Sequence, residues 1–320
     1  MKKFVSILSV LVALCLVIGC FAACSNDADT TSEASVEASD VESTDADATD
    51  ADATDADATE ADAEGILKVI DIQLTNEQYG FAVTEGNTEL LEQLNAFLAQ
   101  IMEDGTYAEI ENKYFGDGTP VGVSIAEATP TGSEDQLVIA TNAEFAPFEY
   151  VEGEYYYGIE IEIMDLFAKS IGKALAVSDM EFDSVCTAVG EGMCDVGVSG
   201  LTITEEREKF LDFTTSYYNA SQKIIALADD TAFDACETAE GCEAVLAGLE
   251  EGIKIGFQTG TTGQFYIVGD VDWDFEGYAN IDGIGYNNGA IAVQDIINGN
   301  IAYVVIDEAP ANSIVAGVNG

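Results

Sequence analysis

The chain contains no histidine among its 320 residues and only 10 basic residues, set against 60 acidic ones. Histidine is the side chain that most often serves as a general acid or base and as a transition-metal ligand, so a hydrolase or a zinc enzyme is disfavoured. The formal charge of −50 would repel nucleic acid and anionic membrane surfaces. The sequence also lacks an EF-hand loop and the GKT or GKS ending of a P-loop. We therefore expect no catalytic residue, no metal, no cofactor and no nucleic-acid partner.

The N-terminus has the pattern of an export signal over residues 1–24. Two lysines precede an uncharged run from Phe4 to Ala23, and small residues lead to a cysteine. The sequence "VIGCFAACSN" resembles a lipobox, which predicts lipidation at Cys24, with Cys20 as the alternative. A simple transmembrane anchor is the other interpretation, because the run is about long enough to span a bilayer.

Residues 25–64 contain fifteen acidic residues, no basic residues and no aromatic residues, and they include the repeat "DATDADATDADAT". Such a segment cannot bury a core, and its self-repulsion favours an extended chain. We expect a disordered acidic tether; a calcium-binding tract is the weaker alternative.

From Gly65 onward the composition is that of a folded α/β protein. Apolar strand patterns such as "QLVIATN", "KIIAL", "IKIGFQT" and "IAYVVID" alternate with helical patterns at 161–171, from about 205, at 243–250 and at 289–298. A further helix from Asn87 carries apolar residues at helical spacing and stops at Gly105, and a shorter one follows over 106–114. The stretch 116–135, rich in Gly, Pro, Thr and Ser, indicates a linker.

Four cysteines lie in the folded part: Cys186, Cys194, Cys236 and Cys242. An even number outside the cell permits disulfides, and the polar spacing "CETAEGC" favours a bond between Cys236 and Cys242. Whether Cys186 and Cys194 also pair stays open, and buried free thiols are the alternative.

Two charged residues suggest a binding site. Arg207, the only arginine, follows a strand and lies beside Thr202 and Thr204; a guanidinium matches a carboxylate in two-pronged geometry. Asp307 ends an apolar strand, where ligands of open α/β sheets tend to bind, and its carboxylate could hold an ammonium group. The alternatives are a surface ion pair for Arg207 and helix capping for Asp307.

Aromatic and glycine-rich stretches could line such a site. Phe145 and Phe182 are candidates, although aromatic residues more often belong to a core. The segment "GTTGQFY" follows a strand and is equally compatible with an ordinary turn.

Seven segments together resemble the family 3 extracellular solute-binding proteins, the polar amino-acid binders of ABC importers. They are "LVIATNAEFAPFEY", "GIEIEIMDLFAKSIG", "GVSGLTITEEREKFLDFTTSYY", "IKIGFQTGTTG", "YVVIDEAPA", "EQYGFAV" and "MEDGTYAEIENKYFG". The resemblance covers nearly all of residues 65–320. It implies a two-lobe periplasmic-binding-protein type II (Venus-flytrap) fold that closes on its ligand about a hinge.

The order of these segments departs from the family. The last two normally close such a chain, and here they open it, which indicates a circularly permuted fold with the linker 116–135 joining the old ends. The predicted first lobe spans 77–228, and the second combines 65–76 with 229–320. Hinge strands would cross near "NEQYGFAV" and "SQKIIAL".

The resemblance also implies ligand-binding roles. Arg207 would hold the α-carboxylate with Thr202 and the backbone of Thr262, and Asp307 would hold the α-ammonium with Gly200 and Thr202.

Four further positions would contact the ligand side chain. Phe145 and Phe182 would sandwich it, and Asn142 and Gln258 would tune selectivity. Asn142 replaces an aspartate that is frequent in the family, which leaves the side-chain preference open. Ala302 replaces an aspartate that is common just before the last strand, and this difference concerns the support of that strand more than the binding site.

The implied function is capture of a free α-amino acid, polar or neutral, at the extracellular face of the cell membrane for an ABC permease and ATPase complex. We expect a monomer attached to the membrane through its lipid anchor only. The alternatives are a dehydratase-like enzyme on the same fold and a surface ligand sensor without a transport role.

Overall fold

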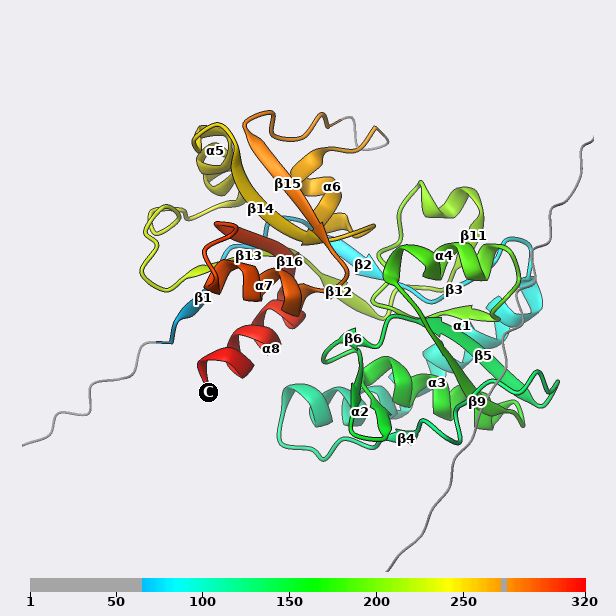
Figure 1. Cartoon of the computed structure of the whole chain (residues 1–320). Coiled ribbons are helices and arrows are strands. Elements are labelled where there is room, and N and C mark those ends of the chain that lie inside the picture. The colour runs from blue at the N-terminus through cyan, green and yellow to red at the C-terminus, as the bar shows by residue number, and fades with distance from the viewer. Residues whose placement is uncertain (1–64, 272–274) are drawn as a thin grey trace, which may run out of the picture. The chain divides into compact units, whose positions relative to one another are not determined.

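The computed structural model describes residues 65–271 and 275–320. The predicted signal peptide (1–24), tether (25–64) and lipidation residues Cys24 and Cys20 lie outside the described residues. Two five-stranded sheets, each covered by helices on both faces, form the body of the chain (Figure 1).

The first lobe is built on the sheet of order β11-β3-β10-β5-β9. Its strands are β11 (Leu211–Phe213), β3 (Ala82–Thr84), β10 (Val196–Gly197), β5 (Gln136–Thr141) and β9 (Ala174–Asp179). Strands β10, β5 and β9 run parallel, whereas β3 runs antiparallel to both of its neighbours. One face packs on α1 (Thr88–Asp104) and α3 (Ile159–Ser170), and the other packs on α4 (Phe182–Gly190).

The helix predicted from Asn87 is confirmed as α1. Asn87 caps it by accepting from the backbone N–H of Leu90, and Gly105 ends it in the left-handed conformation at φ 88°. Leu94, Leu98 and Ile101 are its buried residues, as the helical spacing requires. The second predicted helix, α2 (Thr106–Phe115), packs against α1 and α3.

The second lobe is built on the sheet of order β1-β13-β16-β14-β15. Its elements are β1 (Leu67–Ile70), β13 (Gln222–Leu227), α5 (Ala239–Gly248), β14 (Ile253–Gln258), α6 (Thr262–Val268), β15 (Ile281–Tyr286), α7 (Gly289–Ile297), β16 (Tyr303–Asp307) and α8 (Glu308–Asn319). Val304 and Ile306 belong to one apolar cluster and Tyr303 and Val305 to the other, so β16 is buried on both faces. This explains its uninterrupted apolar sequence.

A two-stranded antiparallel sheet connects the lobes (Figure 1). It consists of β2 (Glu77–Tyr79) and β12 (Tyr218–Ala220). The predicted boundary at residue 228 places β13 in the first lobe, whereas its hydrogen bonds to β1 and β16 place it in the second sheet. The second crossing therefore precedes "QKIIAL".

The stretch 116–135 is folded onto the first lobe rather than looping freely. It contributes β4 (Val123–Ser124), which pairs with β8 (Tyr155–Tyr157) in a small sheet completed by β7 (Glu149–Glu152) and β6 (Glu144–Phe145). Ala128 is fully buried, and its carbonyl accepts from the N–H of Val177. The segment thus adds packing as well as connection.

The helix predicted from about residue 205 is wrong. Only a single 3-10 turn, Arg207–Lys209, forms before β11. Arg207, the first residue of this turn, points its side chain inward and is 7% exposed. On a surface helix the arginine would face the solvent.

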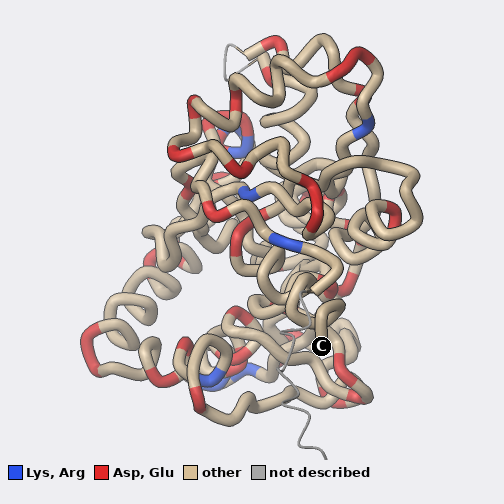
Figure 2. The backbone as a smooth tube through the Cα atoms, turned by 90° about the vertical axis from the view of Figure 1, so that its left-hand side faces the viewer, with Lys and Arg blue, Asp and Glu red and all other residues tan. Residues whose placement is uncertain are grey.

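Acidic residues are spread over both lobes and basic ones are few, as Figure 2 shows. Within the described ranges, no helix combines the length and apolar character needed to cross a bilayer.

Candidate functional site

Arg207 is a buried guanidinium that lacks a carboxylate partner among the described residues. Its Nη1 donates to the carbonyl of Thr202 at 2.7 Å, and its Nη2 donates across to the carbonyl of Gly260 in the second lobe at 3.3 Å. Phe182 lies under it, with the Cζ atom 5.5 Å from the ring centroid. The alternative of a surface ion pair is therefore not what the structure contains. A buried cation without an anion is costly, so this position suits an anionic ligand group.

Asp307 ends β16 and is also buried, at 5% exposure. Its Oδ1 accepts from the hydroxyl of Tyr79 at 2.6 Å, and its side chain makes no capping bond to α8. Burial and the neighbouring charge of Glu77 raise the pKa of Asp307 to about 7. A cationic ligand group next to this carboxyl would lower its pKa again and so favour the charged form.

Glu77, a residue that the sequence analysis did not single out, connects the two lobes. Its Oε2 accepts from the hydroxyl of Thr202 in the first lobe and from that of Thr262 in the second, each at 2.7 Å. Its Oε1 accepts from Thr75 at 2.6 Å. Two predicted site residues are thereby joined through one carboxylate.

A second cross-lobe contact joins the two amides expected to tune selectivity. Gln258 donates through Nε2 to the Oδ1 of Asn142 at 2.8 Å, and both side chains are buried. Asn142 also donates to the carbonyl of Met180 at 3.0 Å, which orients its amide.

The two aromatic residues lie on either side of this network. Phe145 packs over Gly200, which has a φ of 52°; a Cβ at that glycine would come within 2.8 Å of the ring. Phe182 lies beside Gly260 and under Arg207. Both rings are less than a tenth exposed, so core packing and ligand contact remain compatible with their position.

The rim between the lobes carries further amide–carboxylate contacts. Asn288 donates to Glu144 at 2.7 Å, and Asn287 donates to Glu181 at 3.1 Å. A cavity of about 100 Å³ lies here, lined by Glu181, Phe182, Asp183, Thr259, Tyr286 and Asn287. This cavity borders Phe182, one of the predicted site residues.

Beneath the site, Glu149 and Glu160 are buried with their carboxyl groups in contact. Glu160 accepts from the N–H of Gly200 and from the hydroxyl of Tyr217. Burial and the charge of Glu160 raise the pKa of Glu149 well above its usual value. This pair therefore binds a proton more tightly than an exposed glutamate does.

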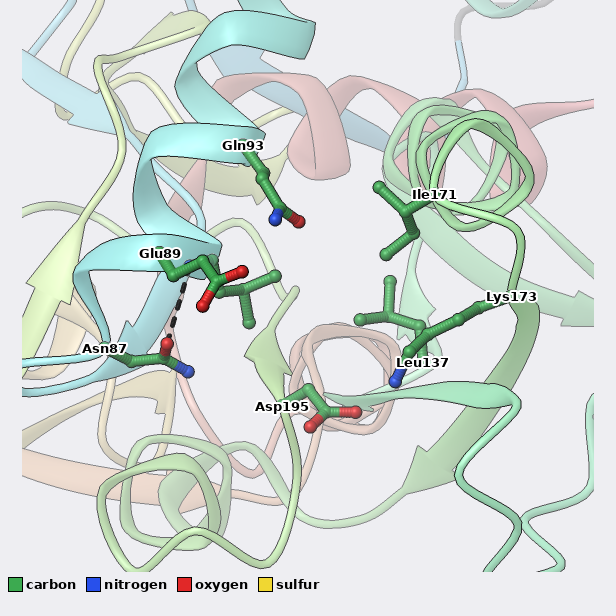
Figure 3. A pocket seen from close by; sticks show the side chains of 8 residues that line it. Asn87, Glu89, Gln93, Leu137, Ile171, Lys173 and Asp195 are labelled. Carbon is green, nitrogen blue, oxygen red and sulfur yellow. Dashed lines mark hydrogen bonds between the residues drawn. The ribbon is translucent and has the colours of Figure 1, made fainter.

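A larger cavity, of about 570 Å³, lies elsewhere on the first lobe (Figure 3). None of the nine predicted site residues lines it. Its polar side chains bond locally: Lys173 donates to the carbonyl of Gln136, and Asp195 accepts from the N–H of Val138. We assign these residues a structural role.

The predicted disulfide between Cys236 and Cys242 is absent; all four cysteines of the described part are free. Cys242 is a fully buried residue of α5, where it packs as a small apolar side chain. Burial, followed by contact with Cys236, raises the pKa of Cys242 to about 12.

The structure brings the predicted residues into one connected region, and it adds Glu77, Tyr79 and Gln222. Gln222 donates to the hydroxyl of Thr262, and its Oε1 is a buried acceptor without a partner in the described part. The signal for Glu77 and Tyr79 was their two-residue spacing on a strand, which turns both side chains to the same face.

Comparison with known proteins identifies relatives of this chain. The family model described as "Bacterial extracellular solute-binding proteins, family 3" matches residues 23–117 and 137–303, well over half of the chain. The "Arginine-binding extracellular protein ArtP" of Bacillus subtilis is 38% identical over 102 residues, which is 31% of this chain and 40% of that protein.

A second curated protein and a solved structure are also similar to this chain. The "ABC transporter arginine-binding protein 1" of Escherichia coli is 27% identical over 179 residues, 56% of this chain and 65% of that protein. A solved structure of "an ancestral arginine-binding protein bound to arginine" is 29% identical with a TM-score of 0.49, covering 57% of this chain and 75% of that one. The chain thus spans less than two thirds of the length of these two curated relatives.

Proposed function

The chain belongs to the bacterial extracellular solute-binding proteins of family 3, and we propose that it captures a free polar α-amino acid between its lobes for an ABC importer. The observation that carries this proposal is Arg207, a buried guanidinium without a carboxylate partner in the described part. Asp307 supplies the opposite charge from the other lobe. Two opposite charges in one desolvated site select zwitterions, because a ligand lacking either charge leaves one unpaired, at a cost of roughly 2–5 kcal/mol.

The mechanism is closure about β2 and β12. In this proposal, Arg207 and the N–H groups near Thr202 and Thr262 hold the α-carboxylate, while Asp307 holds the α-ammonium. Closure is favoured because the ligand contacts both lobes only in the closed arrangement. Phe145 and Phe182 enclose the ligand side chain.

A melting-shift screen of the purified chain against the twenty amino acids, followed by calorimetry, tests this function. We include L-arginine first, because the relatives described above carry that ligand in their names. At least one amino acid should raise the melting temperature, and the same compound should be recovered unchanged. Failure of all twenty would sink the proposal, whereas conversion of the ligand would support a dehydratase-like enzyme.

We further propose that the chain works as a monomer anchored by lipid at Cys24, with Cys20 as the alternative. The permease and ATPase of the importer would be its partners. Replacing each cysteine by alanine in turn and separating membrane from soluble fractions tests the anchor: only the lipidated position should release the protein. Ligand-dependent stimulation of a neighbouring ATPase would separate transport from a sensor role.

Circular permutation is also part of the proposal. Asn319 in α8 accepts from the N–H of Leu67 at 3.2 Å and donates to its carbonyl at 2.9 Å. The C-terminal helix therefore ends beside the first described strand, as expected if α8 once led directly into β1. The division of the family match into two segments is compatible with this order.

A further inference from the structure

In the part of the chain that the structure describes, the buried carboxylate of Glu77 accepts hydrogen bonds from threonine hydroxyls alone. It is 5% exposed and lies on the hinge strand β2. Thr75 donates to one carboxylate oxygen, and Thr202 and Thr262 donate to the other. No lysine or arginine forms an ion pair with it among the described residues. A glutamine would fill the same volume, so packing alone does not explain why a carboxylate stands at this position.

The bonds determine what Thr202 can offer to a ligand. A hydroxyl carries one proton and two acceptor positions. In its hydrogen bond with Glu77 the Thr202 hydroxyl is the donor, so its proton is directed toward Glu77 and away from the ligand. Thr202 Oγ1 has no other hydrogen bond in the described part, which leaves its acceptor positions available.

Thr262 is fixed differently. Its hydroxyl donates to Glu77 and accepts from Gln222 Nε2 at 3.0 Å. One of its two acceptor positions is therefore already used. Thr202 is consequently the hydroxyl of this pair that is better able to receive a ligand donor.

We propose that Glu77 is a positioning residue of the amino-acid site, which holds Thr202 as a hydrogen-bond acceptor and thereby selects ligands that carry an ammonium group. Asp307 lies on the same side, because Tyr79 from the same strand donates to it. This inference rests on the proposed function. The inference adds Glu77 as the residue that makes Thr202 an acceptor, and not a donor, toward the ligand ammonium group.

The test compares L-arginine with 5-guanidinopentanoate, its analogue without the amine, by calorimetry on the full chain. The ratio of their dissociation constants measures selection for the ammonium group. In Glu77→Gln, the side-chain amide can donate as well as accept, so the hydroxyl of Thr202 is free to turn. We expect the ratio to fall at least about tenfold, the equivalent of 1.4 kcal/mol.

Glu162→Gln is the matched control. Glu162 is another buried glutamate, 6% exposed, and within the described residues its partners Lys113, Tyr114 and the N–H of Val121 make no hydrogen bond to Glu77, Thr202 or Thr262. Its replacement should leave the ratio unchanged. If Glu77→Gln weakens both ligands equally, the residue has only a structural role and the inference is overturned.

Two further variants keep the test decisive if Glu77→Gln does not fold. Thr202→Ser should preserve the ratio and Thr202→Val should lower it; an unchanged ratio in Thr202→Val also overturns the inference. If L-arginine does not bind, the same comparison uses the best amino acid of the screen and its desamino analogue. A wild-type chain that binds none of the twenty overturns the proposed function and this inference together.

Discussion

At the scale of single residues, two properties of Arg207 define the site. Its side chain is buried, and its positive charge has no carboxylate partner among the described residues. Its bonds go to the carbonyls of Thr202 and Gly260, which are dipoles and not anions. The ligand-free protein therefore bears the cost of a desolvated cation. The same feature that favours a carboxylate ligand should lower stability without it.

Arg207→Met should separate these two effects. We expect the melting temperature of the ligand-free chain to stay constant or rise, because an apolar side chain replaces an unpaired buried charge. Ligand affinity should fall by 2–5 kcal/mol, roughly thirtyfold to several thousandfold. Melting curves and calorimetry measure both. Lys169→Met, at an exposed position paired with Asp165, should change neither quantity appreciably; a ligand response retained in Arg207→Met would contradict the assignment.

Glu149 provides a pH-dependent prediction. Because its pKa in the fold is raised above that in the unfolded chain, the folded state retains a proton that the unfolded chain loses. Its contribution to stability is therefore complete below pH about 4.5 and is lost as pH rises through the folded pKa. Glu149→Gln mimics the protonated form and can still bond to Ser199 and Glu160.

Urea unfolding at pH 5 and pH 9 measures this effect. Glu149→Gln should be close to wild type at pH 5 and more stable at pH 9, by on the order of 1 kcal/mol. Glu152→Gln, an exposed position on the same strand, should show no such pH-dependent gain. Equal stability differences at both pH values would show that the pair does not share a proton.

At the scale of elements, the segment 116–135 illustrates where composition misleads. Ala128 is fully buried, whereas Ala126 in the same segment is exposed. Ala128→Leu should overpack the first lobe and lower the free energy of unfolding by about 1–3 kcal/mol. Ala126→Leu introduces the same side chain at a solvent-facing position and should be nearly neutral. Chemical denaturation measures the free energy of unfolding of both variants. Equally small losses in the two would mean that 116–135 is a free linker and does not pack on the first lobe.

The sequence predicted the elements that have a strong hydrophobic periodicity. It did not predict the short elements in which apolar and polar residues follow no regular pattern. Spacing alone specified α1, and the apolar run "YVVID" specified β16 because both of its faces are covered. The 3-10 turn at Arg207 was mistaken for a helix, since one inward-facing arginine leaves no periodic signal.

The site was predictable to a similar, partial degree. Arg207 and Asp307 stood out as a unique arginine and a charge at a strand end. Glu77 did not, because its partners Thr202 and Thr262 lie 125 and 185 residues away in sequence and nothing local indicates their convergence. Such contacts arise only when the lobes and hinge strands have come together.

At the scale of the whole molecule, the order of the segments is itself testable. Asn319 and Leu67 exchange two hydrogen bonds, so the gap between the end of α8 and the start of β1 is short. A rearranged chain would run from 136 to 320, continue through two glycines into 65, and end at 117, which omits residues 118–135.

This rearranged chain should fold and bind the same amino acid, because all nine predicted site residues and Glu77 are retained. It should be less stable than the present order, since it lacks β4 and the buried Ala128. Calorimetry with the best ligand of the screen measures the first expectation, and urea unfolding measures the second. The same rearrangement carrying Arg207→Met is the control for specific binding. A soluble, folded product without ligand response would mean that the present order is required for the site, and circular permutation would then be rejected as the origin of this chain.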